Sequence, residues 1–189
     1  FKEPPEYMLS NRFFLSHNSN NLDHWMNAPL SRAFSNDING LLQDPDVGFD
    51  SFDQELEWNT FLQLNAYRLS QDLPQLIWND NLARIARGRA FGHILSPGYS
   101  HNMPCIGGTL KGSLDRWGMK PQTGLRENIA WMRNNFEQHY CADDIIQAWS
   151  SSPAHRENML REARYLGIGV IRKKSGSMRG LEAVMISVL

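Results

Sequence analysis

Three polar side chains are the first candidates for chemistry in this sequence: His101, Glu127 and His155. Imidazole and carboxylate groups transfer protons and bind divalent metals in many proteins. The three residues are 26 and 28 positions apart, so no local turn brings them together. A shared site therefore depends on the fold, because an isolated histidine is more often a bystander than a functional group.

The familiar catalytic signatures are missing. The sequence has no Gly-x-Gly-x-x-Gly, no phosphate loop, no His-Glu-x-x-His, no Cys-x-x-Cys and no Gly-x-Ser-x-Gly. The 189 residues carry 19 basic and 20 acidic side chains, a net charge of −1, which argues against a nucleic acid as partner. The apolar runs are far shorter than the roughly 20 residues of a transmembrane helix.

Composition changes near residue 55. Residues 1–55 are rich in Asn, Ser, Asp and Pro and keep no regular period, so we expect an N-terminal extension that packs on the rest of the chain. Residues 56–189 are expected to form one domain with a single core, which needs no disulfide framework. The chain begins with Phe rather than Met, which indicates that any signal peptide has been removed.

The first predicted helix of this domain follows residue 55 and ends before Pro74. Its apolar stripe is formed by Trp58, Phe61, Leu62 and Leu69. Asn65 lies on the same stripe, so we expect its amide to bond inside the fold. A second helix is predicted from Asn79-Asp80 to a residue before Ser96, and a short third helix over 109–117.

A fourth helix is predicted from Asp143 through Trp149, and a fifth begins after Ser152-Pro153, which resembles a helix cap followed by proline in the first turn. This start places His155 in the first turn of that helix. The tail alternates β-branched residues on either side of 173–177, which predicts a β-hairpin. Helices followed by strands favour an α+β domain with a small antiparallel sheet.

Tryptophans and cysteines have simpler roles. Trp78, Trp117 and Trp149 are predicted as core anchors, because an indole ring buries a large area. Cys105 and Cys141 leave two alternatives open. They either form a disulfide, which would suit an exported protein, or remain as two buried thiols.

Several short motifs follow one another in a fixed order over about residues 57–189: Leu-Asn-Ala-Tyr-Arg (64–68), Leu-Pro-Gln-Leu-Ile-Trp (73–78), Tyr-Ser-His (99–101), Glu-Asn-Ile-Ala (127–130), Ala-Trp-Ser-Ser-Ser-Pro-Ala-His-Arg-Glu-Asn-Met-Leu (148–160) and Gly-Ile-Gly-Val (167–170). This ordered set resembles the bacterial branch of the CAP superfamily, which comprises the cysteine-rich secretory, antigen 5 and pathogenesis-related proteins. Their common unit is also called the SCP domain.

The resemblance implies an α-β-α sandwich, in which helices flank a small central antiparallel sheet. It also implies a cleft that holds two His and two Glu in animal members, sometimes around a divalent metal. The matching motifs give His101, Glu127 and His155, and Asn128 follows Glu127. Ser152 stands where the second Glu would be, and Arg126 stands where Gly often precedes the first.

The departures at Ser152 and Arg126 bear on metal binding. His101 and His155 would supply two ligands for Zn²⁺ or another divalent metal, with Glu127 as a third ligand or as an orienting group. Pairing with Arg126 would hold Glu127 as an anion and weaken its attraction for a metal. We therefore expect at most a weakly bound metal.

Three functions follow from the resemblance. The first is a secreted or cell-envelope binding module without catalysis, whose cleft of His101, Glu127, His155, Ser152 and Asn128 binds a small hydrophobic ligand, a lipid or an envelope component. The second is a metal-dependent hydrolase or peptidase in which Glu127 serves as general base. The third is a protein-interaction module with a vestigial cleft.

Overall fold

A computed structural model describes residues 53–95, 100–119, 124–133, 140–173 and 180–189. The predicted packing of the N-terminal extension falls on residues 1–52, which lie outside these ranges, so that prediction stays untested. None of the described helices is long and apolar enough to cross a membrane.

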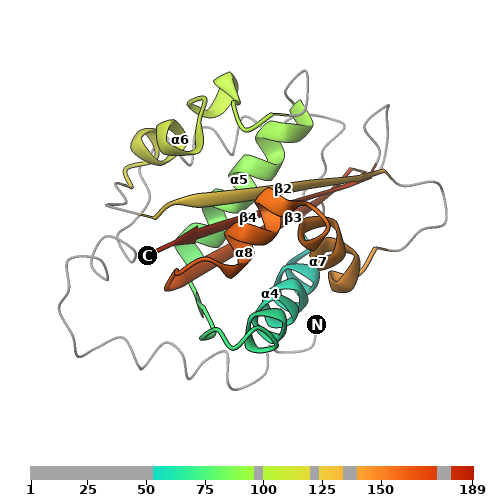
Figure 1. The fold of residues 1–189 in the computed structure, drawn as a ribbon. Helices are drawn as coiled ribbons and strands as arrows, with labels where there is room; N and C mark the ends of the chain where they lie inside the picture. The colour runs from blue at the N-terminus through green and yellow to red at the C-terminus, as the bar shows by residue number, and fades with distance from the viewer. Residues whose placement is uncertain (1–52, 96–99, 120–123, 134–139, 174–179) are drawn as a thin grey trace.

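The described elements form three layers (Figure 1). One face of the sheet carries α5 (Asp80–Leu95), η2 (Pro104–Ile106) and α6 (Leu110–Arg116), and the opposite face carries α4 (Gln54–Leu69), α7 (Ala142–Ser150) and α8 (Pro153–Leu160). The strands between them are β1 (Ile77–Trp78), β2 (Arg126–Arg133), β3 (Tyr165–Lys173) and β4 (Gly180–Val188). This arrangement confirms the predicted α+β sandwich.

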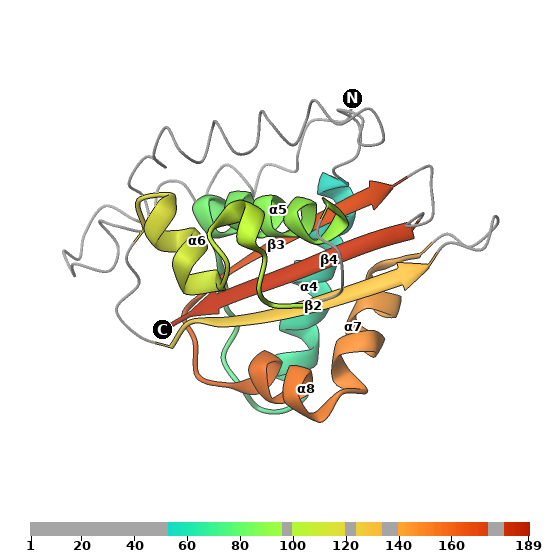
Figure 2. The same ribbon diagram turned by 90° about the horizontal axis from the view of Figure 1, so that it is seen from above.

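The sheet has the strand order β1-β3-β4-β2, which leaves β2 at one edge (Figure 2). The predicted tail hairpin is confirmed, since β3 and β4 pair antiparallel, and β2 extends the antiparallel part on the other side of β4. The two-residue β1 adds to β3 in parallel, so the sheet is mixed at that end. We did not predict β2, because its polar residues at 126–128 hide the alternation that follows.

Alternate residues of the strands face two separate cores. Val184, Ile186 and Val188 of β4 pack toward α5, whereas Leu181, Ala183 and Met185 pack toward α4 and α7. Trp117 and Trp149 are fully buried, one in each core, as predicted. Trp78 is only half-buried and packs edge-on against the rings of Trp58 and Phe61.

The predicted starts of the helices are confirmed where a cap marks them. Asn79 accepts the amide hydrogen of Leu82 at 2.9 Å and begins α5, and Thr109 accepts that of Gly112 and begins α6. Asn65 bonds the backbone of Leu76 through both its amide nitrogen and its amide oxygen, as expected for a polar residue inside the fold.

The predicted apolar stripe of α4 is wrong in part. Leu62 and Leu69 are 42% and 53% exposed, whereas the buried face includes the polar residues Glu57, Thr60 and Arg68. These polar groups are tolerated because each has a partner. Glu57 accepts from Arg87 and from the backbone of β3, and Arg68 donates to carbonyl groups at the end of α8. A hydrophobic pattern alone cannot find such a face.

Both alternatives for the cysteines are wrong. Cys105 lies in η2 and Cys141 precedes α7; the two residues form no disulfide, and both are exposed. They belong to elements on opposite faces of the sheet, so the fold itself keeps them apart.

The close contact between α5 and β3 depends on two glycines, and it generates the first prediction. A methyl group on Gly167 would lie 2.1 Å from the backbone nitrogen of Ala83, and one on Gly169 would lie 2.2 Å from that of Arg87. Gly167→Ala should therefore destabilise the domain by about 1–3 kcal/mol, because the helix must move away from the sheet. Thermal unfolding measures this loss.

Asn59→Ala on the exposed face of α4 is the control, and it should change stability by less than about 0.5 kcal/mol. An unfolding temperature of Gly167→Ala equal to that of the control would contradict this packing.

Candidate functional site

The three candidate side chains converge on the edge strand β2. His101 lies in the segment between α5 and η2, Glu127 is the second residue of β2, and His155 lies in the first turn of α8. Nδ1 of His101 is 2.8 Å from Oε2 of Glu127. The pKa of His155 is lowered by burial and then by the charge of His101, which places the two imidazoles within electrostatic reach of each other.

β2 is an edge strand, and its alternate side chains contact the helical layers on the two faces of the sheet. Glu127 and Ile129 alternate toward the α5 layer, whereas Asn128 turns toward α8, where its Nδ2 donates to the carbonyl oxygen of His155 at 2.8 Å. The site therefore combines residues from the two faces of the sheet.

A fourth residue, Arg89 of α5, holds this site together and was not predicted. Its guanidinium group is fully buried and uses all five N–H groups. Nε and Nη2 donate to the two carboxylate oxygens of Glu127 at 2.7 and 2.9 Å. The remaining donors reach the carbonyl oxygens of His101 and Gly108 and the hydroxyl of Ser113.

Periodicity could have found Arg89. The residues of α5 that face the sheet recur at helical spacing, and the same stripe that carries Leu82, Ile85 and Ala86 continues through Arg89 to His93. The sequence alone does not mark Arg89 as a site residue, because arginines usually lie on the solvated face of a helix.

Burial by itself would raise the pKa of Glu127. The hydrogen bond with His101 and the ion pair with Arg89 outweigh burial and hold that pKa below its usual value. The predicted pairing of Glu127 with Arg126 is wrong, because successive residues of a strand point to opposite faces of the sheet. Arg126 instead donates to the carbonyl oxygen of Leu125.

The α8 side of the site is fixed at both ends of the helix. Asn128 of β2 binds the first turn of α8 at the carbonyl oxygen of His155, and Asn158, in the second half of the helix, donates to Oδ1 of Asn128 at 2.9 Å. Arg68 donates to the carbonyl oxygens of Met159 and Arg161 at 2.7 and 2.8 Å, which caps the other end with a positive charge. Ser152 occupies the predicted cap position, but its hydroxyl makes no capping hydrogen bond.

Two buried titratable groups on the α5 side were not predicted. Burial, with a smaller opposing effect of Glu127, lowers the pKa of His93 to about 4, so its ring is neutral at pH 7. Glu182 of β4 is 1% exposed, and neither of its carboxyl oxygens has a hydrogen-bond partner among the residues that the structure describes. Burial and then the charge of Glu127 raise the pKa of Glu182 well above its usual value.

The described side chains do not fit a divalent metal. No group of three or more His, Cys, Asp or Glu in the described ranges is arranged to hold a metal ion. Both oxygens of Glu127 already accept from Arg89, so an incoming cation would meet a buried guanidinium group. The electrostatics of the site therefore oppose the metal that the resemblance implied.

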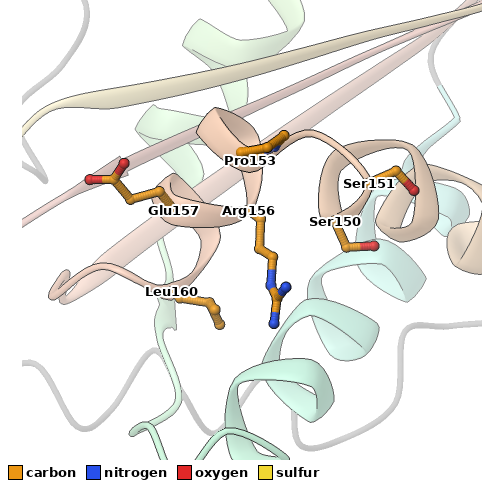
Figure 3. A pocket seen from close by; sticks show the side chains of 6 residues that line it. All are labelled: Ser150, Ser151, Pro153, Arg156, Glu157 and Leu160. Atoms are coloured by element: carbon orange, nitrogen blue, oxygen red, sulfur yellow. The ribbon is translucent and has the colours of Figure 1, made fainter.

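A shallow pocket of about 410 Å³ lies along α7 and α8 (Figure 3). It is lined by Ser150, Ser151, Pro153, Arg156, Glu157 and Leu160. None of the candidate site residues lines it. This pocket is thus distinct from the predicted cleft.

Comparison with known proteins gives one family and several structures. The model of the cysteine-rich secretory protein family, CAP, matches residues 62–187. No curated protein matches the sequence. An extracellular protein containing an SCP domain from Bacillus anthracis is 27% identical with a TM-score of 0.56, over 71% of this chain and 41% of that one.

Two further structures share the fold at 19% identity. A cysteine-rich secretory protein from Staphylococcus aureus has a TM-score of 0.55 over 74% of this chain and 39% of that one. An outer surface protein from Borrelia burgdorferi has a TM-score of 0.52 over 68% of this chain and 88% of that one. The chain thus spans about two fifths of the length of the Bacillus and Staphylococcus proteins.

The second prediction concerns Arg89. Arg89→Met should destabilise the domain by about 3–5 kcal/mol near neutral pH, because it leaves a buried carboxylate without a cation. In the native chain the lowered pKa of Glu127 gives stability that is present above the unfolded pKa and lost as pH falls through the folded pKa. Urea unfolding at about pH 4.5 and about pH 7.5 measures both effects.

In Arg89→Met the ion pair no longer opposes the effect of burial, so the pKa of Glu127 should rise. The loss of unfolding free energy relative to the native chain should therefore be smaller at acidic pH. The double variant Arg89→Met with Glu127→Leu should recover most of the loss, since it removes both charges together. If the single and double variants lose the same unfolding free energy, Arg89 acts by packing alone.

The third prediction concerns Glu182. A group whose pKa is raised on folding contributes stability that is present below its unfolded value and is lost as pH rises through the folded pKa. Glu182→Gln should therefore flatten the decline in stability above about pH 4.3 and be at least as stable as the native chain near neutral pH. Glu162→Gln, on an exposed residue, should leave the pH profile unchanged. If the stability of Glu182→Gln and that of Glu162→Gln change with pH in the same way, Glu182 is not a buried, protonated carboxyl group.

Proposed function

The chain belongs to the cysteine-rich secretory protein family, CAP, and on this premise we propose that it is a non-catalytic binding module of the cell exterior or envelope. Its ligand is a small hydrophobic molecule, a lipid or an envelope component, which binds at the cleft around His101, Glu127 and His155. The proposal also assigns Ser152, which precedes α8, and Asn128 of β2 to this cleft.

The main support for this proposal is that both carboxylate oxygens of Glu127 already have hydrogen-bond partners. A general base needs an oxygen free to take a proton and a pKa near the working pH. Glu127 accepts two hydrogen bonds from Arg89 and one through His101, and its pKa is lowered rather than raised. A carboxylate in this state orients its neighbours but is a poor base, which favours binding over hydrolysis.

The location outside the cytoplasm is supported by the proteins that share the fold. One is described as extracellular and another as an outer surface protein. Since this chain spans about two fifths of the Bacillus protein, the activity and partners of a longer protein could involve parts beyond this domain.

A hydrolase remains the second candidate, and one contact favours it. Nδ1 of His101 faces a carboxylate oxygen at 2.8 Å, and the side chain of His101 is 55% exposed. A carboxylate can fix the tautomer of an imidazole so that its Nε2 takes a proton from water or a hydroxyl. In such an enzyme His101 would be the base and Glu127 its orienting partner. The nearby hydroxyl of Ser100 accepts the amide hydrogen of Asn102.

The fourth prediction tests the proposed function with the full chain. Protein expressed with export and extracted with organic solvent should yield a bound lipid or other hydrophobic molecule by mass spectrometry. His101→Ala and His155→Ala should reduce the recovered ligand or its affinity about tenfold, because the proposal assigns both rings to the lining of the cleft. Lys111→Ala, on the exposed face of α6, should retain it.

Three results would count against this proposal: a chain that is consistently empty, ligand retained equally in all three variants, or hydrolysis of ester or peptide substrates that disappears in His101→Ala. Elemental analysis of the same preparations should find far less than one zinc per chain. Stoichiometric zinc that is lost in both His variants would restore the metal-dependent hydrolase.

A further inference from the structure

Arg126 and Ser187 are neighbours on the face of the sheet that carries α4, α7 and α8. The register of β2 and β4 makes them a cross-strand pair, and the side chains of such a pair point to the same face. Ser187 alternates along β4 with Met185, which packs in the core on this face. Arg126 alternates along β2 with Asn128, which binds the carbonyl oxygen of His155 in α8. The Cβ atoms of the pair are therefore about 5 Å apart.

The guanidinium group of Arg126 has no anionic partner in the described part of the chain. Its Nη1 donates to the carbonyl oxygen of the preceding residue, Leu125, at 2.8 Å. Among the described strands, no Asp or Glu shares this face, because Glu127 and Glu182 both point to the opposite one. Arg89 already neutralises Glu127 there. The start of β2 therefore keeps one positive charge that the sheet does not balance.

The hydroxyl of Ser187 also lacks a partner. Ser187 is 1% exposed, and its Oγ makes no hydrogen bond with any residue that the structure describes. A polar group removed from water nearly always has a partner, and a hydroxyl can donate to an anionic oxygen. The amides of Asn128 and Asn158 on the same face are both paired, so unmet hydrogen bonding is not a general feature of this region.

Solvent reaches this pair at Arg126. Arg126 lies on the edge strand and is partly exposed, whereas Ser187 lies on the next strand inward and is buried. An anion from solvent therefore meets the guanidinium group first, with the hydroxyl on the inner side of that contact. The planar fork of a guanidinium group matches the oxygens of a carboxylate or a phosphate.

Arg126 also borders the proposed cleft. It directly precedes Glu127 and stands two positions before Asn128, which holds the first turn of α8. Residues so spaced on a strand are about 7 Å apart. The resembling family often has Gly where this chain has Arg126, and Gly brings no charge. Arg126 is therefore placed to add a charge requirement to the ligand of this cleft.

We propose that Arg126, backed by the hydroxyl of Ser187, binds the anionic group, a carboxylate or a phosphate, of the ligand in the cleft. The ligand is thus an amphiphile with an acidic head rather than a neutral hydrophobic molecule. This inference rests on the proposed function, because it specifies the ligand class of the same cleft. The anion does not approach Glu127, whose side chain points to the other face.

The test uses the full chain and three probes with the same hydrocarbon tail: decanoate, decyl phosphate and decanol. Equilibrium dialysis measures their affinities below the concentrations at which they form micelles. Both anions should bind at least about tenfold more tightly than decanol, because a charge-assisted pair with the guanidinium group adds to the contacts of the tail. The tighter of the two anions identifies the head group.

Three variants locate the site. Arg126→Gln should remove the preference for the anions and leave the affinity for decanol unchanged, and it should unfold at the native temperature because it loses no ion pair. Ser187→Ala should reduce the preference by a smaller factor, about threefold, since it removes one hydrogen-bond donor. Arg133→Gln, at the other end of β2 and on the opposite face, removes the same charge and should keep the preference.

The inference is overturned if decanol binds as tightly as both anions, if Ser187→Ala binds the anions like the native chain, or if Arg126→Gln and Arg133→Gln reduce the preference equally. A second measurement needs no variant: the nuclear magnetic resonance signal of the Arg126 Nε should shift with decanoate and not with decanol. An unshifted signal would contradict the site.

Failure of the proposed function gives a different result. The cleft predicts that His101→Ala and His155→Ala weaken all three probes alike. If both variants bind the probes like the native chain while Arg126→Gln still removes the preference, the cleft is wrong and the anion site stands by itself. If none of the three probes binds the native chain, this inference is overturned together with the cleft.

Discussion

The domain is organised around one buried ion pair, that of Arg89 with Glu127. A guanidinium group removed from water is costly unless every donor is satisfied, and here the five donors reach a strand, a helix and two loop carbonyl groups. The satisfaction of Arg89 thus requires α5, α6, β2 and the segment at His101 to be in place together. The position of His101 is a consequence of this requirement, because its carbonyl and its ring are both held.

Glu57 is a second buried carboxylate, and its pKa is shifted in the opposite direction from that of Glu127 because its surroundings differ. Glu57 pairs with Arg87 and accepts the amide hydrogen of Val170, yet burial dominates and its pKa is raised. Arg87 is partly exposed, whereas Arg89 is fully buried, and Glu127 has His101 as an additional partner. Glu57 therefore closes the far edge of the sheet as a structural group. Glu127 remains an anion beside an exposed imidazole.

The parts of the fold that follow from local rules were predictable. Asn79 and Thr109 mark helix starts with their own side chains, and the β-branched tail specifies its hairpin. The face that α4 buries was not predictable from hydrophobicity, because the buried side chains of Glu57 and Arg68 bind partners more than 25 residues away. The motifs of the family identified His101, Glu127 and His155. They did not include Arg89, and they did not show that Glu-Asn-Ile-Ala lies in an edge strand, because both features depend on contacts between distant segments.

The net charge of the residues around Glu127 differs from that of a metal centre built from two imidazoles and two carboxylates. Two imidazoles and two carboxylates would carry a charge of about −2 at neutral pH, which a divalent cation neutralises. In this chain Ser152 takes the place of one carboxylate, and Arg89 neutralises the other. The same interaction that fixes the geometry of the site therefore removes its attraction for a metal. What remains at the edge strand is a hydrogen-bonded pair of Glu127 and His101 whose negative charge is already balanced by a buried guanidinium group.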